Sequence, residues 1–484
     1  GGDLFGIYYE AATGALHGLN ASGWAPARLT PQFLDERGIT EMPRLGIHTV
    51  TVPGAVAGWE ALRARFGRLP LADILAPAVV YAEEGFPVSE VIAAAWAAQV
   101  EKLAAVPHAA ATWLVDGRAP RAGEIFSNRQ LAGSLRLLAR QGADAFYRGE
   151  IAHAIVRASD AAGGTMTPAD LDDYAPEWVT PVSTTYRGWT VYELPPNTQG
   201  VAALMMLNLM EAFPIGSYGF HSREALHVMI ESKKLAYADM LRYAADPRAV
   251  DVPVEAMLSK RRAQQWARLI DQRRVAHTVE PSTYDGLTSA RGSETVYLCA
   301  VDRDGNMVSL IQSLFEPFGS GVVPEGTGIT LQNRGSLFTL DTRHPNVLAP
   351  RKRPLHTIIP GFMACRDARI AFGIMGGFNQ AQAHAQFVAH IVDFGLDIQQ
   401  ALEAGRFTKR SFAGPDVEIE VHVPELVRRE LEAMGHDVRV VGARSAAFGY
   451  GQAVLCDHAG VHFGASDPRH DGAAIPEAPA VFAS

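Results

Sequence analysis

The chain has 484 residues, of which 48% are hydrophobic, and a formal net charge of −9. This length and composition allow a large buried core, and the negative charge provides no basic field for nucleic acid or an anionic membrane, so a small-molecule partner is expected. Three widely spaced cysteines without a CxxC pair argue against a disulfide framework and a cysteine metal site, and no apolar run reaches the length of about 18 residues that predicts a membrane span.

The chain opens with Gly1-Gly2-Asp3, without an initiator Met and without the basic and apolar regions of a signal peptide. We therefore expect that upstream residues are missing, and any signal peptide with them. The sequence leaves a cytoplasmic and a periplasmic location open.

The first half of the chain is predicted to be mainly helical, with turn-rich loops between the helices. The clearest helix covers 222–244, where Ser222 is a suitable N-cap and apolar residues recur every three or four positions until Asp246-Pro247. This apolar stripe indicates core packing rather than a cofactor site.

A β-hairpin is predicted where the helical spacing of apolar residues gives way to continuous β-prone runs. Residues 295–301 and 307–314 are two β-prone runs, and the turn signal DRDGN at 302–306 separates them. Because neither run alternates with polar residues, both strands are expected to be covered on both faces, as in sheet layers between helices.

The rest of the chain is typical of an α/β protein. A strand at 369–374 runs into Met375-Gly376-Gly377 and is followed by a helix at 381–393. Further strands are predicted at 416–421 and 437–441, with a helix at 424–434 between them. Because no internal repeat or low-complexity linker is present, a single structural unit is expected.

The stretch from Thr295 to Gly321, TVYLCAVDRDGNMVSLIQSLFEPFGSG, resembles the segment that opens the small subunit of gamma-glutamyltransferases. These proteins are self-cleaving N-terminal-nucleophile (Ntn) amidohydrolases. Gly1-Gly2 resembles a glycine-rich element well inside the family's large subunit. Other blocks that resemble the family, in its order, are VPGAVAGW (52–59), GGTMTPADLDDY (163–174), YRGWTVYELPPNTQG (186–200), AYADMLRYAADP (236–247), LQNRGSLF (331–338), APRKRPLHTIIP (349–360), GIMGGFNQ (373–380) and GASDPR (464–469).

This resemblance implies an α/β fold, the four-layer αββα Ntn-hydrolase sandwich, with a helix-rich large-subunit portion. Residues 1–294 correspond to the large-subunit region, truncated at its N-terminus, and 295–484 to the small-subunit region. The two regions are expected to form one intertwined catalytic domain and, after cleavage, a heterodimer. Further dimerisation is left open.

The resemblance also identifies Thr295 as the nucleophile and the Glu294–Thr295 bond as the cleavage site. A threonine hydroxyl is a weak nucleophile at neutral pH and needs a base. Cleavage before Thr295 frees an α-amine with a reference pKa near about 8, which can take the hydroxyl proton and then protonate the leaving amine.

The oxyanion of the tetrahedral intermediate is expected to be bound by backbone N–H groups of Gly376 and Gly377, which match the family's oxyanion glycines and lie between a predicted strand and a helix. Ser313 matches a hydroxyl residue that assists the nucleophile. Asn333 falls in the matching substrate loop, although an asparagine in a turn is commonly structural.

The substrate side departs from the glutathione-cleaving pattern. Ser22 stands in place of an arginine that binds the substrate α-carboxylate, and His356 with Thr357 in place of paired serines. Phe315, Arg334 and Leu337 replace an asparagine, a glutamine and an aspartate that bind the α-amino group. Leucine cannot accept a hydrogen bond from ammonium and arginine repels it. The position of Glu316 in the sequence makes it a possible substitute acceptor.

We therefore hypothesise that the catalytic core is retained while selectivity for γ-glutamyl groups is reduced or lost. Arg334, His356 and Thr357 would then receive a carboxylate-bearing acyl group without the α-amine, such as a dicarboxylate monoamide, a glutaryl amide or an oxamate-like amide. In the alternative interpretation, Arg334 pairs with a neighbouring acid and His356 is a satisfied core histidine.

Two functional classes remain open at this point, and the first contains two alternatives. The first is an autoprocessed amidohydrolase or acyltransferase acting through an acyl-Thr295 intermediate, either a glutathione hydrolase proper or an oxamate-type or glutaryl acylase-like enzyme. The last is a non-catalytic binding protein that keeps the fold. The implied mechanism uses a small-molecule amide and water or an amine as acceptor, with no metal, no organic cofactor and no nucleic acid.

Overall fold

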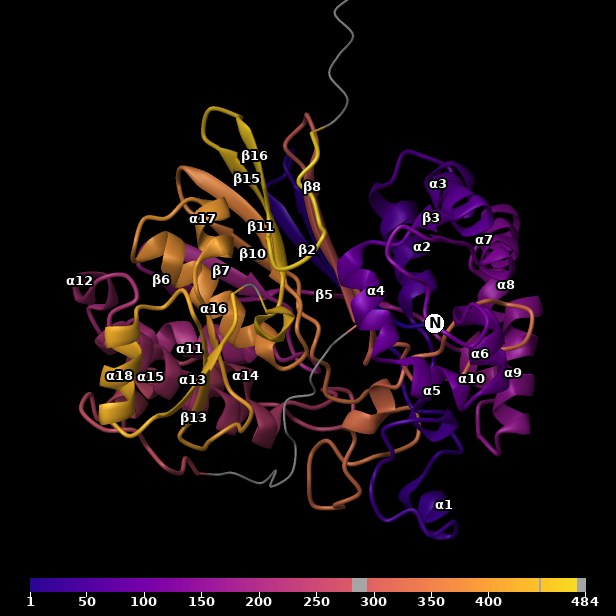
Figure 1. The fold of residues 1–484 in the computed structure, drawn as a ribbon, viewed down its shortest axis with the longest axis horizontal. Coiled ribbons are helices and arrows are strands. Elements are labelled where there is room, and N and C mark those ends of the chain that lie inside the picture. The colour runs from indigo at the N-terminus through magenta and orange to yellow at the C-terminus, as the bar shows by residue number, and fades with distance from the viewer. Residues whose placement is uncertain (281–293, 444, 477–484) are drawn as a thin grey trace, which may run out of the picture.

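The computed structural model describes residues 1–280, 294–443 and 445–476, and two β-sheets lie at its centre (Figure 1). The first sheet has the strand order β5-β2-β1-β9-β8 and is antiparallel throughout. Its strands are β5 (Glu177–Val179), β2 (Ala15–Ala21), β1 (Asp3–Glu10), β9 (Met307–Phe315) and β8 (Glu294–Val301). Strands from the beginning and from the middle of the chain thus share one sheet.

The second sheet has the order β16-β15-β11-β10-β7-β6 and is also antiparallel. Its strands are β16 (His462–Ser466), β15 (Gly451–Asp457), β11 (Ala368–Ile374), β10 (Gly361–Ala364), β7 (Trp189–Glu193) and β6 (Val182–Tyr186). Side chains from the facing sides of both sheets, such as Phe5 and Ile311 of the first and Phe362 and Ala371 of the second, fill the interior. The two sheets are the inner layers of the sandwich.

Helices cover the outer faces of the two sheets. Against the second sheet pack α11 (Gly200–Met210), α13 (Arg223–Tyr243) and α16 (Asn379–Val392). Every residue of α11 is buried, because this helix is apolar on all sides. On the first sheet, Ala55 of α2 (Ala55–Phe66) packs against apolar residues of β1 and β2. The order of layers is therefore αββα, which confirms the predicted fold class.

Residues 71–172 form a helical lobe beside the first sheet, on the right in Figure 1. Its elements are α3 (Leu71–Glu84), β3 (Phe86–Pro87), α4 (Glu90–Ala97), α5 (Val100–Ala104), α6 (Pro107–Trp113), β4 (Ile125–Phe126), α7 (Arg129–Gln141), α8 (Asp144–Tyr147), α9 (Glu150–Ala161) and α10 (Pro168–Asp172). The shorter helices elsewhere are α1 (Pro31–Asp35), α12 (Ile215–Tyr218), α14 (Val254–Met257) and α15 (Lys260–Ala267). Three 3-10 turns lie at Ile47–Thr49, Arg334–Leu337 and Ala446–Phe448.

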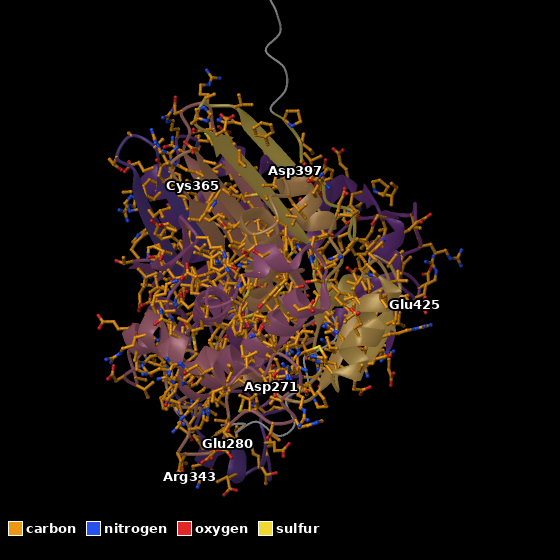
Figure 2. All side chains as sticks on the ribbon, turned by 90° about the vertical axis from the view of Figure 1, so that its left-hand side faces the viewer. Asp271, Glu280, Arg343, Cys365, Asp397 and Glu425 are labelled. Carbon is orange, nitrogen blue, oxygen red and sulfur yellow. The ribbon has the colours of Figure 1, made fainter. Side chains whose placement is uncertain are left out.

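The C-terminal part adds a small sheet of order β12-β13-β14. Its elements are α17 (Ile398–Glu403), β12 (Phe407–Thr408), β13 (Asp416–Glu420), α18 (Glu425–Ala433) and β14 (Asp437–Val441). In Figure 2, Glu425 marks the start of α18, and Cys365 marks the β10–β11 turn on the opposite side of the view.

The predicted elements occur with small shifts at their ends. The helix predicted at 222–244 is α13, and the Ser222 hydroxyl caps it by accepting a hydrogen bond from the Ala225 N–H at 3.2 Å. The predicted hairpin is the β8–β9 pair. The prediction that both of its strands are covered on both faces is wrong for β8. This strand lies at the sheet edge, and Val296 and Leu298 are 57% and 46% exposed.

Candidate active site

Thr295 and Ser313 face each other at the end of the hairpin. They are register partners on β8 and β9, both are 6% exposed, and the Thr295 hydroxyl donates to Ser313 Oγ at 3.1 Å. The packing around Ser313 is close, because a Cβ on Gly2 would lie 2.1 Å from the Ser313 carbonyl oxygen. The predicted nucleophile and the predicted assisting hydroxyl are therefore in contact.

The hairpin register shifts at the predicted cleavage position. Thr295 pairs with Ser313 but Glu294 pairs with Phe315, so Leu314 is an extra residue on β9. Phe315 has a φ of 79°, in the left-handed region, and its N–H donates to Ser313 Oγ at 2.8 Å. Such β-bulges redirect side chains and are frequent beside active sites.

Arg334 reaches the same hydroxyl from the 3-10 turn Arg334–Leu337. Its side chain is fully buried, Nη2 donates to Ser313 Oγ at 3.3 Å, and Nη1 donates to Thr357 Oγ1 at 2.7 Å. Among the described residues no carboxylate lies within 4.0 Å of this guanidinium, and Nε has no hydrogen-bond partner. Burial lowers the pKa of Arg334 to about 9, against the opposing effect of Asp3 and Glu316, so the group is protonated at neutral pH.

Glu316 and Asn333 form a polar bridge beside Arg334. The Asn333 side chain donates to Glu316 Oε2 at 3.1 Å and to the Arg44 carbonyl at 2.9 Å, and its Oδ1 accepts from the Glu316 N–H at 3.1 Å. The Glu316 carboxylate also forms an ion pair with the exposed Arg44. Both predicted substrate residues thus already have partners within the protein.

Gly376 and Gly377 form the turn between β11 and α16, with φ values of 135° and 61°. Their carbonyl oxygens accept from the first two N–H groups of α16, at 3.1 Å and 3.2 Å. Their own N–H groups donate to no acceptor in the described part of the chain. Two unpaired N–H groups at a helix N-terminus are suited to bind a developing negative charge.

Gln199 connects this turn to the arginine. Its Nε2 donates to the carbonyl oxygens of Thr357 at 2.5 Å and Gly377 at 2.8 Å. A continuous path of contacts therefore runs from Thr295 through Ser313, Arg334, Thr357 and Gln199 to Gly377. Sequence reasoning did not single out Gln199, which lies inside one of the resembling blocks without a distinguishing pattern.

His356 contacts Asp3, a second residue that sequence reasoning missed. The His356 Nε2 lies 3.0 Å from Asp3 Oδ2, and Nδ1 accepts from the Ile358 N–H at 3.4 Å. Burial lowers the pKa of His356 to about 3, so the ring is neutral at neutral pH. Both ring nitrogens are engaged, and the Thr357 hydroxyl, rather than His356, contacts Arg334.

Ser22 and Leu337, two further positions that differ from the glutathione-cleaving pattern, are buried and contact other parts of the protein. The Ser22 hydroxyl donates to Asn20 Oδ1 at 2.7 Å, and its carbonyl oxygen accepts from Arg353 Nε at 3.0 Å. The Leu337 side chain is 5% exposed and belongs to the large apolar core. It offers no acceptor to a substrate ammonium.

One group of potential metal ligands occurs in the described residues, and it lies outside the path of contacts. The His227, Glu231 and His436 donor atoms lie within 4.8 Å of one another. His227 Nδ1 is hydrogen-bonded to His436 Nε2 at 2.8 Å, and Lys234 Nζ donates to Glu231 at 2.6 Å. The ligand atoms are therefore paired, and the adjacent ammonium opposes a cation.

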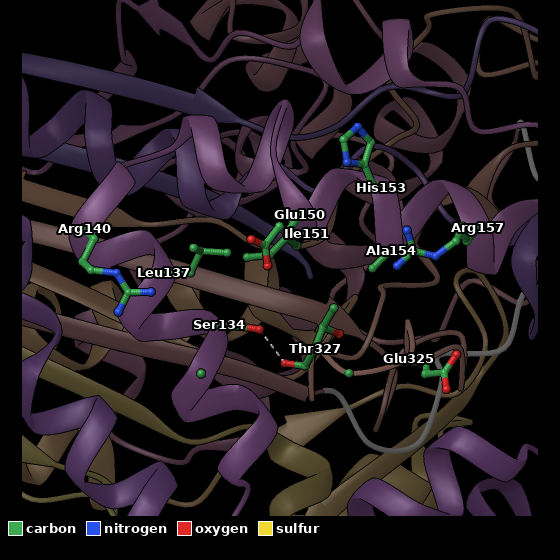
Figure 3. Close-up of a pocket in the computed structure, with 12 residues that line it drawn as sticks. Ser134, Leu137, Arg140, Glu150, Ile151, His153, Ala154, Arg157, Glu325 and Thr327 are labelled. Atoms are coloured by element: carbon green, nitrogen blue, oxygen red, sulfur yellow. Dashed lines mark hydrogen bonds between the residues drawn. The ribbon is translucent and has the colours of Figure 1, made fainter.

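A surface pocket of about 510 Å³ opens between α7, α9 and the loop at 325–327 (Figure 3). Ser134 and Thr327 are joined across it by a hydrogen bond of 2.8 Å, and exposed charged side chains such as Arg140, Glu150 and Arg157 line its mouth. None of its lining residues is a predicted site residue. Within the described residues, no helix is long and apolar enough to cross a membrane.

Known proteins are similar to this chain over most of its length. Residues 1–477 match the family model described as gamma-glutamyltranspeptidase. The chain is 38% identical to the glutathione hydrolase-like YwrD proenzyme of Bacillus subtilis, covering 98% of this chain and 89% of that protein. It is 35% identical to the oxamate amidohydrolase proenzyme of Klebsiella pneumoniae, covering 94% and 86%.

Among solved structures, the cephalosporin acylase from Bacillus halodurans superposes with a TM-score of 0.90 at 41% identity, covering 98% of this chain and 86% of that one. The resemblance found in the sequence is thereby confirmed, and the relatives are hydrolases and acylases named as proenzymes. This chain belongs to the gamma-glutamyltranspeptidase family and is an Ntn-type amide hydrolase.

Proposed function

We propose that the chain cleaves itself before Thr295 and then hydrolyses the amide of a carboxylate-bearing acyl group through an acyl-Thr295 intermediate. The observation that carries this proposal is the contact of Thr295 with Ser313, which also receives a hydrogen bond from Arg334. Arg334 is fully buried and has no carboxylate partner among the described residues. The nucleophile thus lies beside a group suited to bind an acyl carboxylate.

In self-cleavage, Thr295 Oγ1 attacks the Glu294 carbonyl carbon, the C–N bond of this peptide breaks, and the acyl group moves to oxygen. Water then hydrolyses the ester, which leaves a carboxylate on Glu294 and a free amine on Thr295. The products are residues 1–294 and 295–484. We expect them to stay together as a heterodimer, because β1 and β2 from the first share a sheet with β8 and β9 from the second.

In substrate hydrolysis, Thr295 Oγ1 attacks the amide carbonyl and its proton passes to the Thr295 α-amine. The N–H groups of Gly376 and Gly377 bind the oxyanion, each contributing about 3–4 kcal/mol to the transition state. Collapse breaks the amide C–N bond while the ammonium returns its proton to the leaving amine. Water, or an amine acceptor in a transfer reaction, then releases the acyl group from Thr295.

The acyl group is proposed to lack an α-amine. Arg334 would bind its carboxylate together with Thr357, whereas His356 has both nitrogens occupied by Asp3 and Ile358. An α-ammonium would meet a cation at Arg334 and an apolar side chain at Leu337, and Glu316 is already paired with Arg44. This favours a dicarboxylate monoamide, of the glutaryl or oxamate type, over a γ-glutamyl substrate.

A glutathione hydrolase is the second candidate, because the chain is also 31% identical to the glutathione hydrolase proenzyme of Escherichia coli, covering 92% of this chain and 78% of that protein. In that case Glu316 would have to leave Arg44 and receive the ammonium. The contacts of Glu316 favour the first candidate, since its carboxylate also accepts a hydrogen bond from Asn333.

Intact-mass analysis of the purified wild type and of Thr295→Ala tests the proposal. We expect two polypeptides that divide between Glu294 and Thr295 in the wild type and one in the variant. Ser309→Ala is the control, because it removes a buried hydroxyl from the same hairpin, one that is hydrogen-bonded to the Tyr297 hydroxyl and the Phe372 carbonyl. A wild-type chain that stays intact, or a Thr295→Ala chain that still cleaves, contradicts the proposed nucleophile.

A further inference from the structure

Phe315 has a backbone conformation that is unfavourable for its residue type. It ends β9 with a φ of 79°, a region that glycine adopts readily and that is unfavourable for residues with a side chain. A bulky residue persists in such a conformation where the surroundings hold it there, and such residues cluster at functional sites.

Two different parts of Phe315 contact the site. Its N–H donates to Ser313 Oγ at 2.8 Å, and its ring lies 4.3 Å from the centre of the Arg334 guanidinium. The side chain is 5% exposed. A cation over an aromatic face is stabilised most when water is excluded, as it is at this position.

The stacking leaves the edge of the guanidinium available. Arginine has five N–H donors in one plane, and Arg334 directs one to Thr357 and one to Ser313. The two acids whose charges influence it are occupied, since Asp3 accepts from His356 and Gln332 and Glu316 pairs with Arg44. The ring covers one face of the guanidinium, and its remaining N–H donors lie in the guanidinium plane, where they can bind an anion.

The ring also affects what can bind beside Arg334. A phenyl group offers no hydrogen-bond acceptor, and it excludes the water that would otherwise hydrate a substrate ammonium. A carboxylate gains from this dry surrounding because its charge-assisted hydrogen bonds to guanidinium strengthen. An α-ammonium in the same space loses its hydration without receiving a partner.

We propose that Phe315 is the specificity-determining residue of this site. Its ring holds the Arg334 guanidinium in the orientation that binds an acyl carboxylate, and it excludes an acyl group that carries an α-ammonium. This inference rests on the proposed amide hydrolysis at Thr295. The N–H contact to Ser313 makes Phe315 a positioning residue as well.

Three substitutions separate the two contributions. Phe315→Gly removes the ring while glycine accepts the φ of 79°, so the N–H contact to Ser313 remains possible. Phe315→Leu keeps apolar bulk without the cation–π contact, and Phe315→Tyr keeps the stack. Phe463→Leu, on β16 and 50% exposed, is the matched control for replacing a phenylalanine elsewhere.

The substrates are glutaryl-p-nitroanilide and γ-glutamyl-p-nitroanilide, which differ only in the α-amine. We expect Phe315→Leu and Phe315→Gly to lower the kcat/KM ratio of the first to the second by about tenfold, mainly through KM for the glutaryl compound. Phe315→Tyr should retain most of the wild-type ratio, and Phe463→Leu all of it. Melting temperature and two-chain mass confirm that each variant is folded and processed.

The outcomes separate this inference from the proposed function. An unchanged ratio in folded, processed Phe315→Leu and Phe315→Gly overturns the role of the ring. A wild type that neither cleaves itself nor hydrolyses either anilide overturns the proposed function instead. Equal loss on both substrates, through kcat alone, would make Phe315 a structural support of Ser313 and would also overturn the specificity role.

Discussion

At the scale of single residues, Arg334 is the most informative side chain of the site. A fully buried guanidinium without a carboxylate partner is costly unless hydrogen bonds compensate it or a ligand completes the pairing. The sequence alone left open whether Arg334 pairs with a neighbouring acid. In the described residues it does not, which supports the interpretation that its carboxylate comes from the substrate.

We expect Arg334→Gln to reduce kcat/KM for glutaryl-p-nitroanilide by between about tenfold and a hundredfold, because a charge-assisted pair is lost. Arg334→Lys should recover little, since an ammonium cannot form the two-pronged contact. In the wild type, KM should rise as the pH passes about 9, the pKa to which burial lowers Arg334, because half of the guanidinium groups are uncharged at that pH. Efficient wild-type hydrolysis of γ-glutamyl-p-nitroanilide with poor activity on the glutaryl compound would rule this role out.

At the scale of elements, two helices hold the glycine turn that precedes α16. The Gln199 side chain, just before α11, binds the Gly377 carbonyl. From α13, the Tyr237 hydroxyl donates to the Phe378 carbonyl and accepts from the Gln382 N–H at 3.3 Å. Because the turn itself has few side chains, its geometry depends on these contacts from neighbouring elements.

Removing the Tyr237 hydroxyl should therefore affect stability and catalysis together. We expect Tyr237→Phe to lower the free energy of unfolding by about 1–3 kcal/mol, because two buried backbone groups lose their partner. It should also lower kcat by about tenfold or more, because the Gly376-Gly377 turn that is proposed to bind the oxyanion would be displaced. Denaturant unfolding and steady-state kinetics measure the two effects.

The control for this experiment is Tyr186→Phe. It removes another buried hydroxyl, which donates to Asp393 at the opposite end of α16 from the glycine turn. Stability should fall in this variant while kcat stays at the wild-type value. A Tyr237→Phe enzyme with unchanged kcat would show that the hydroxyl supports only the fold.

The same elements explain what the sequence could and could not predict. The hairpin, α13 and the strand before Gly376 were predictable because turn residues, an N-cap and apolar periodicity are local signals. The exposed face of β8 was not, since an edge position depends on which strand lies next to it. Asp3 and Gln199 were missed for a similar reason: their partners, His356 and Gly377, lie far away along the chain.

At the scale of the whole molecule, the interior contains several neutral histidines. Burial, as the largest cause, lowers the pKa of His356, His390 and His436 to about 3 and that of His221 to about 4. In the unfolded chain a histidine has a pKa near about 6.5. Below that pH the unfolded state binds protons that the folded state does not, so folding becomes less favourable as the pH falls.

We expect the free energy of unfolding to decrease between pH 7 and pH 5, by up to about 1.4 kcal/mol per pH unit for each such histidine. His390→Asn should flatten this dependence, because an amide can keep a donor near the Ala401 carbonyl, which lies 3.3 Å from His390 Nδ1, without titrating. His458→Asn, at an exposed position, should leave the dependence unchanged. Urea unfolding at pH 7, 6 and 5 measures the slope. If the free energy of unfolding of His390→Asn and of the wild type falls equally between pH 7 and pH 5, His390 does not contribute to the acid sensitivity, which then comes from other groups.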